Sequence, residues 1–136
     1  MALIPTLTLF DVEAKKAKVS AEENEMWIKQ AVQELKAYSD AGGQVLFGTD
    51  AGYIDQFDTA EEFQLMSRAG LSFQQILASL TTNPATRFGY SSHSGRIAKG
   101  MDADLVVLDG DPARDVTAFS KVHHVIKGGK LTYPIR

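Results

Sequence analysis

One carboxylate in this sequence directly follows a short apolar run and is flanked by small residues. Residues 44–52 read Gln-Val-Leu-Phe-Gly-Thr-Asp-Ala-Gly, so Asp50 stands where the apolar run stops. Many α/β proteins deliver a catalytic acid in this way, at the carboxyl end of a buried strand. The segment therefore predicts a buried strand over residues 44–49 with an acid at its end. Taken alone, the same residues also fit an ordinary Asx turn.

Apart from carboxylates, the sequence offers few side chains that bind metals. The sequence has no cysteine, and its three histidines are His93, His123 and His124. His123 and His124 are neighbours in a predicted strand, where successive side chains point to opposite faces, so we expect no ion to be shared by them. His93 stands among serines and is expected to be a solvated loop residue.

Length and composition limit the classes of protein that fit. The chain has 136 residues, of which 44% are hydrophobic, enough for one ordinary domain but too few for a complete (β/α)8 barrel of about 250 residues. A net charge of −3 gives no basic surface for nucleic acid or for an anionic membrane. No segment has the apolar length of a membrane span, and the first ten residues lack the basic start of a signal peptide. The composition suits a cytoplasmic protein.

The first ninety residues alternate between β-like and helical patterns. Residues 3–10 predict a strand or a strand followed by a loop, and residues 20–38 predict a helix that opens with a capping box. A second helix is expected from residues 58–61 to Gly70, and a third over residues 72–80. Asn83 is expected to cap a final short helix that has proline at its first position.

The pattern changes after Tyr90. Small polar residues form a linker-like stretch over residues 91–95, and β patterns then predict strands around Ile97 and over residues 104–109. Residues 122–127 and 130–133 flank a Gly-Gly pair, which predicts a hairpin with a two-residue turn. The boundary between an α/β part and a small β part is expected near residues 90–95.

Three segments in this order resemble the C-terminal part of the amidohydrolase superfamily. They are residues 44–52, residues 95–109 (Gly-Arg-Ile-Ala-Lys-Gly-Met-Asp-Ala-Asp-Leu-Val-Val-Leu-Asp) and residues 125–130 (Val-Ile-Lys-Gly-Gly-Lys). The resemblance is greatest to imidazolonepropionase-like and Xaa-Pro dipeptidase-like members, and it runs from about residue 4 to residue 131. It implies an α/β fold in which residues 1–92 form βα units 7 and 8 of a (β/α)8 barrel. Residues 93–136 would then form part of a small composite β-sandwich.

The resemblance also assigns roles to individual residues. Asp50 matches the aspartate that ends the eighth barrel strand, binds the metal and transfers the proton, and Gly48, Thr49 and Gly52 would shape its turn. Tyr53 is expected to contact the substrate. The family's His-x-His pair, its later lysine or glutamate and its two further histidine ligands have no counterpart here. One carboxylate is too few for a catalytic zinc ion, so Asp50 would bind metal only if partner ligands were supplied.

We therefore expect the C-terminal portion of a metal-dependent hydrolase that acts on a non-peptide or dipeptide C–N bond. The complete enzyme would use a divalent metal, zinc by preference, and a small amide-like substrate, whereas this chain alone would bind no metal and be inactive. The alternative is a non-catalytic binding or assembly module, or a truncated product, that keeps the same scaffold. Two barrel strands without their neighbours leave open edges, so a homo-oligomer or a partner chain is expected. No nucleic acid or membrane is expected as a partner.

Overall fold

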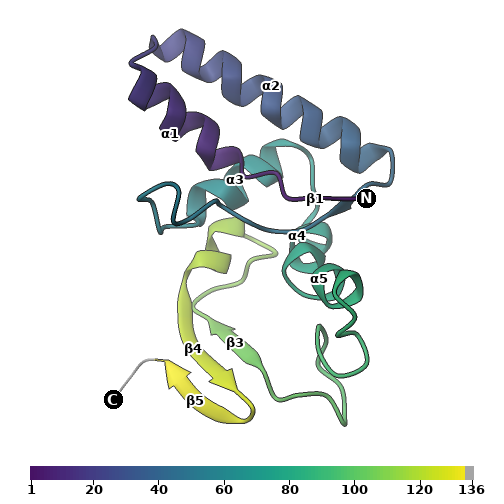
Figure 1. The fold of residues 1–136 in the computed structure, drawn as a ribbon. Helices are drawn as coiled ribbons and strands as arrows, with labels where there is room; N and C mark the ends of the chain where they lie inside the picture. The colour runs from purple at the N-terminus through teal and green to yellow at the C-terminus, as the bar shows by residue number, and fades with distance from the viewer. Residues whose placement is uncertain (134–136) are drawn as a thin grey trace.

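The structure is a computed structural model that describes residues 1–133, and it combines helices with two separate small sheets (Figure 1). In chain order the elements are β1 (Ala2–Leu3), α1 (Leu7–Ala17), α2 (Ala21–Asp40), β2 (Gln44–Val45), α3 (Ala60–Arg68), α4 (Phe73–Leu80), α5 (Thr82–Arg87), β3 (Leu105–Leu108), the 3-10 helix η1 (Val116–Ser120), β4 (Val122–Lys127) and β5 (Lys130–Tyr133).

The first sheet consists of two short parallel strands. Ala2 of β1 pairs with Gln44 of β2, and Leu3 pairs with Val45. The two helices α1 and α2 connect these strands, as a parallel crossover requires. The predicted strand over residues 44–49 is thus regular only at its first two positions. Its predicted burial is confirmed at Val45 and Leu46, which are each 5% exposed.

The prediction of a strand over residues 3–10 is largely wrong, because helix α1 begins at Leu7. The buried residues of α1 are Leu7, Thr8, Asp11 and Ala14, which is helical spacing. The Leu-Thr-Leu-Phe start has the apolar and β-branched residues typical of a strand, and this local preference is overridden by packing of the helix against α2 and α3.

Two helices begin with the local signals that the sequence predicts. The Ser20 hydroxyl accepts a hydrogen bond from the Glu23 amide at 3.1 Å, and the Glu23 carboxylate accepts one from the Ser20 amide at 2.9 Å. Ser72 and Gln75 make the same reciprocal pair at the start of α4. These capping boxes confirm the predicted starts of α2 and α4.

The short helix α5 begins differently from the prediction. Thr81, not Asn83, is its N-cap residue, and Asn83 lies inside the helix. The Asn83 side-chain amide instead donates a hydrogen bond to the Val45 carbonyl at 2.9 Å. Asn83 therefore bonds to the backbone of β2 and does not act as the helix cap that the local sequence predicts.

The second sheet is antiparallel, with strand order β3-β4-β5. Strands β4 and β5 form the predicted hairpin, and Gly128 and Gly129 adopt φ values of 55° and 76° in its turn. Positive φ at both central residues is the requirement of a type I′ turn, which explains the glycine pair. The strand predicted around Ile97 is absent, because that segment is irregular in the structure.

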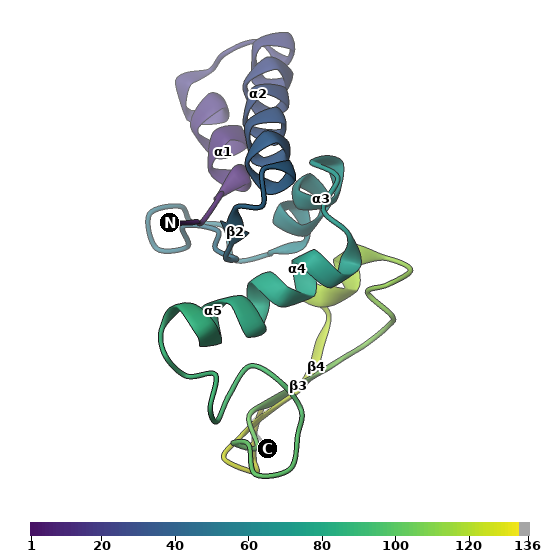
Figure 2. The same ribbon diagram turned by 90° about the vertical axis from the view of Figure 1, so that its right-hand side faces the viewer.

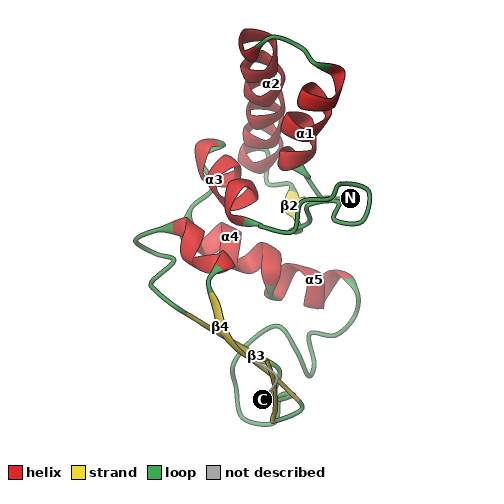
Figure 3. Ribbon diagram, turned by 90° about the vertical axis from the view of Figure 1, so that its left-hand side faces the viewer, coloured by secondary structure: helices red, strands yellow, loops and turns green. Residues whose placement is uncertain are grey.

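The molecule is elongated, with α1 and α2 at one end and the β3-β4-β5 sheet at the other (Figures 2 and 3). Phenylalanine rings connect the two ends. Phe63 of α3 stacks on Phe47 at 4.6 Å between centroids and contacts Phe119 of η1 at 5.1 Å, and Phe119 lies 5.9 Å from Phe73 of α4. The buried cluster therefore continues from the parallel strands into the segment that leads to the hairpin.

Candidate active site

Asp50 lies at the end of the segment that follows β2, in the left-handed region at φ 60°. Its side chain is exposed, and its backbone carbonyl accepts hydrogen bonds from the amides of Tyr53 at 3.0 Å and Ile54 at 3.2 Å. Within residues 1–133 the Asp50 carboxylate accepts no hydrogen bond, so the turn is held by the backbone and not by an Asx interaction. No contact among the described residues therefore prevents the carboxylate from binding another group.

Backbone contacts on both sides fix the segment that carries Asp50. The Leu46 amide donates to the Leu3 carbonyl at 2.8 Å, and the Phe47 amide donates to the Ser79 carbonyl at 3.1 Å. A Cβ atom at Gly48 would lie 2.5 Å from Cγ2 of Ile4, so a side chain at this position would force the Ile4 side chain to move.

The loop after Asp50 is anchored at one buried residue. Ile54 is 1% exposed, and Gly52 adopts φ 107°, a value that side chains disfavour. Tyr53 is exposed in this loop, and Nζ of Lys16 lies 5.0 Å from the centroid of its ring, within the range of a cation–π contact. Tyr53 thus shares a loop with Asp50, and its predicted contact with substrate stays a prediction.

The described residues do not fit a catalytic metal ion by themselves. No group of three or more histidine, cysteine, aspartate or glutamate side chains between residues 1 and 133 is arranged to hold one. His93 lies in the loop expected for it and contacts Asp102, with 2.6 Å between its Nδ1 and the carboxylate. Any metal bound through Asp50 would need further ligands from outside this chain.

The prediction for His123 and His124 is wrong in its geometry. Their ring centroids lie only 4.2 Å apart, edge to face, and not on opposite faces of the strand. The pairing of β3 with β4 shifts between Val107 and Leu108, which leaves His123 unpaired in a bulge. A bulge interrupts the alternation of side chains, and this explains why adjacent rings meet.

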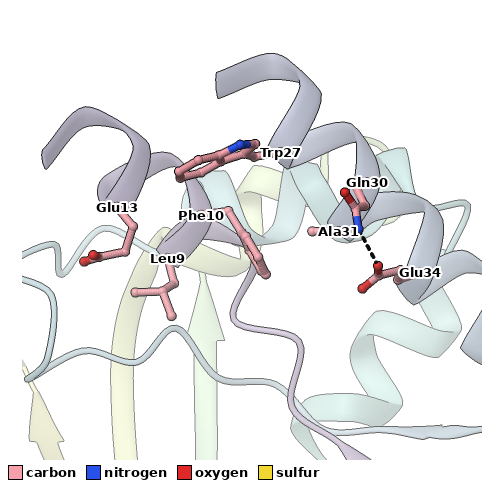
Figure 4. Close-up of a pocket in the computed structure, with 7 residues that line it drawn as sticks. All are labelled: Leu9, Phe10, Glu13, Trp27, Gln30, Ala31 and Glu34. Atoms are coloured by element: carbon pink, nitrogen blue, oxygen red, sulfur yellow. Dashed lines mark hydrogen bonds between the residues drawn. The ribbon is translucent and has the colours of Figure 1, made fainter. Parts of the chain in front are cut away.

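Two cavities among residues 1–133 lie away from Asp50. One of about 350 Å³ lies between α1 and α2, where Phe10 and Trp27 line it and the Gln30 amide donates a hydrogen bond to Glu34 (Figure 4). The other, of about 660 Å³, lies between α4, α5 and the β3-β4-β5 sheet. Neither Asp50 nor Tyr53 lines either cavity.

One buried carboxylate, on the helix that follows the Asp50 loop, could not be recognised from the neighbouring residues in the sequence. Glu62 of α3 is fully buried and accepts hydrogen bonds from Leu7 and Thr8 at the start of α1. Burial raises the pKa of the Glu62 carboxyl above its ordinary value, although the donors of Thr8 and Leu7 act in the opposite direction. Its partners lie 54 and 55 residues away in the chain, so spacing alone could not reveal it.

Comparisons with known proteins agree with the predicted relationship. Ochratoxinase of Aspergillus niger is 33% identical over 118 residues, which cover 79% of this chain and 24% of that enzyme. A Xaa-Pro dipeptidase structure with bound methionine superimposes with a TM-score of 0.83 and 25% identity, over 96% of this chain and 34% of the other. The A. niger ochratoxinase structure gives a TM-score of 0.73 and 25% identity, over 96% and 31%.

These matches confirm the predicted fold class: a mixed α/β chain that corresponds to part of the (β/α)8-barrel amidohydrolases. The chain spans only 24% of the ochratoxinase sequence and 34% of the Xaa-Pro dipeptidase chain. No helix within residues 1–133 combines the length and apolar character needed to cross a membrane. Residues 2–132 match the profile of the Amidohydrolase family, and the chain therefore belongs to that family.

Proposed function

We propose that Asp50 is the metal-ligating and proton-transferring carboxylate of a hydrolase that cleaves a C–N bond in a small amide-like substrate. The observation that carries the proposal is the position of this carboxylate. It stands exposed and without a hydrogen-bond partner among residues 1–133, in the segment that follows the carboxyl end of β2 at Val45, in a chain of the amidohydrolase family. Active sites of (β/α)8 barrels are built at this end of the strands.

The chemistry asks two things of such a residue. Hydrolysis of a C–N bond needs a nucleophile derived from water and a proton for the leaving nitrogen. A carboxylate that accepts the proton of the water and returns it to the nitrogen satisfies both demands. A bound divalent metal, zinc in this proposal, would supply the acidity of the water.

The remaining ligands would come from outside this chain, either from a longer polypeptide or from a second chain. This follows from the lack of any three-ligand group among residues 1–133. In this proposal the chain by itself has no appreciable hydrolase activity. The named relatives, a Xaa-Pro dipeptidase and an ochratoxinase, support a dipeptide or another small molecule as substrate. In this proposal Tyr53, in the loop after Asp50, contacts that substrate.

A chimera tests this proposal. The part of the Xaa-Pro dipeptidase that superimposes on this chain would be replaced by residues 1–133, and metal content and dipeptide hydrolysis would be measured. We expect Asp50→Asn to lower kcat by about 10²- to 10⁴-fold, the range typical of general acid–base groups. It should also lower the metal content of the folded chimera.

Asp58→Asn in the same chimera is the matched control. Asp58 is an exposed carboxylate in the same loop, and its side chain accepts a hydrogen bond from the Ala60 amide at 2.9 Å, which asparagine can also accept. It should keep activity and metal. If Asp50→Asn behaves like the control in a folded chimera, the proposal is wrong, and a non-catalytic module that keeps the scaffold becomes the better interpretation.

A further inference from the structure

The first turn of α1 has no local cap. Thr6 occupies the N-cap position in the left-handed region at φ 45°, its side chain makes no capping hydrogen bond, and no acidic residue lies in the first turn. Leu7 and Thr8 are 2% and 1% exposed, so water cannot satisfy their amides. Buried amides at a helix start need acceptors from elsewhere in the molecule.

Glu62 of α3 supplies these acceptors from the opposite helix. Its Oε1 accepts a hydrogen bond from the Leu7 amide at 2.9 Å, and its Oε2 accepts from the Thr8 amide at 2.8 Å and from the Thr8 hydroxyl at 2.9 Å. Both carboxylate oxygens are therefore used at the amino end of α1, where partial positive charge favours an anion. Figure 1 shows the start of α1 lying beside α3.

This arrangement fixes the relative position of two helix starts. Thr6 is a residue type that often caps helices, but in its left-handed conformation its hydroxyl makes no capping hydrogen bond. Glu62 is instead 0% exposed, and burial of a carboxylate is unfavourable unless it is well paired. What a local cap cannot provide is a direct bond between the first turn of α1 and the first turn of α3.

The two helices that Glu62 joins, α1 and α3, are each next to the segment that carries Asp50. The residues before α1 include Ile4, whose Cγ2 occupies the space in which Gly48 lacks a side chain. The loop that carries Asp50 continues into α3, which contains Glu62. Lys16, near the other end of α1, lies over the ring of Tyr53 in that loop. A shift of α1 relative to α3 would therefore move the surroundings of Asp50 on two sides.

We infer that Glu62 is a positioning residue: by capping α1 from α3 it holds residues 4–8 against residues 48–50 and so sets the place of the Asp50 carboxylate. The inference rests on the proposed function for its relevance to catalysis. The structural role of Glu62 can be tested without metal or substrate. A failure of this inference is therefore distinguishable from a failure of the proposed function of Asp50.

The test uses the whole chain and residue-resolved NMR near neutral pH. In Glu62→Gln we expect the amides of Leu7 and Thr8 to exchange about tenfold faster, which corresponds to the loss of about one net hydrogen bond. We also expect the amide resonances of Gly48, Thr49 and Asp50 to shift. Glu61→Gln is the matched control, because it removes a charge from the same turn of α3 while its amide oxygen can still accept the hydrogen bond from Gln56. It should change neither set of signals.

A second variant separates positioning from simple helix capping. Thr6→Asp in the Glu62→Gln background places a negative charge at the amino end of α1, which the helix dipole favours, but makes no bond to α3. We expect slower exchange at Leu7 and Thr8 to return while the shifts at residues 48–50 remain. If Glu62→Gln leaves residues 48–50 unshifted, or if Thr6→Asp restores them, Glu62 acts only as a cap and the inference is wrong.

A milder variant covers the case in which Glu62→Gln fails to fold. Thr8→Val removes one of the three hydrogen bonds to Glu62 and keeps the shape of the side chain. It should produce shifts at residues 48–50 in the same direction but smaller. No shift at these residues in folded Thr8→Val would likewise overturn the inference.

Discussion

At the scale of single residues, Asp50 and Glu62 show opposite uses of a carboxylate. The Asp50 carboxylate is exposed and accepts no hydrogen bond within residues 1–133, whereas the Glu62 carboxylate is fully buried and accepts three. Asp50 could be singled out from the sequence because a family motif surrounds it. Glu62 could not, because its partners lie on a helix more than fifty residues away and the sequence contains no local mark of that contact.

We expect the chain on its own to retain no equimolar zinc after extensive dialysis. A catalytic zinc ion usually takes three protein ligands, and Asp50 supplies one. Elemental analysis of wild type and Asp50→Asn checks this. Asparagine also tolerates the left-handed conformation at position 50, so the variant should stay folded, with its free energy of unfolding changed by less than about 0.5 kcal/mol. Equimolar zinc in wild type that is lost in Asp50→Asn would contradict the prediction.

Glu62 should give the stability of the chain a characteristic pH dependence. Burial raises its folded-state pKa above the ordinary value of 4.5, so the folded state binds this proton more tightly than the unfolded state. Its contribution to the free energy of unfolding is therefore fully present below pH 4.5 and is lost as the pH rises through the folded-state pKa.

Urea denaturation of wild type and Glu62→Gln at a series of pH values measures this contribution. The stability of wild type relative to Glu62→Gln should fall as the pH rises above about 4.5, and the same comparison with Glu61→Gln gives the control. A relative stability that rises with pH in this window would mean that the hydrogen bonds from Leu7 and Thr8 outweigh desolvation.

At the scale of elements, the sequence predicted correctly those helix starts and turns that a few adjacent residues determine. The capping boxes at Ser20 and Ser72 and the Gly-Gly hairpin are each specified by a few adjacent residues, and all three are confirmed. The predictions for α1 and for Asn83 are wrong because contacts with elements distant in the sequence determine the local structure there. The start of α1 is stabilised by Glu62 of α3, and Asn83 is bound to the Val45 carbonyl of β2.

The β4–β5 turn allows a prediction that depends on backbone conformation alone. A Cβ at Gly128 would meet no atom within 4 Å, so a substitution there tests only the cost of its φ of 55°. We expect Gly128→Val to lower the free energy of unfolding by about 1–2 kcal/mol, because β-branched residues disfavour the left-handed region. Gly128→Asn should cost much less, since asparagine enters this region readily. Equal costs in thermal or urea unfolding would show that the turn tolerates other conformations.

At the scale of the whole molecule, the phenylalanine contacts join the helical end to the β3-β4-β5 end. Phe119 is 8% exposed and lies between Phe63 and Phe73. We expect Phe119→Ala to lower the free energy of unfolding by about 3–5 kcal/mol, the usual effect of removing a buried ring. Phe57→Ala is the control, because Phe57 is 76% exposed and should contribute little. A small effect of Phe119→Ala would mean that the two ends fold independently, as the predicted boundary between residues 92 and 93 would allow.

The whole molecule also presents surfaces that a barrel enzyme would cover. The outer edges of both β1 and β2 are free of strand partners within residues 1–133, and β5 is an edge strand whose four residues are all exposed. Large apolar side chains are exposed as well, among them Met26 on α2 and Ile97 beside the sheet. Open strand edges and apolar surface favour association with another chain.

We therefore expect the isolated chain to self-associate or to require a partner chain. Sedimentation velocity should give a mass above that of the monomer, increasing with concentration. If the edge of β5 takes part, Leu131→Lys should lower that mass, because an added charge opposes pairing between edges. Lys130→Arg keeps the existing charge on the same strand and should leave the mass unchanged. A compact monomer at high concentration would show that these surfaces are stable in water, and the arrangement inherited from a barrel would then not explain how this chain folds.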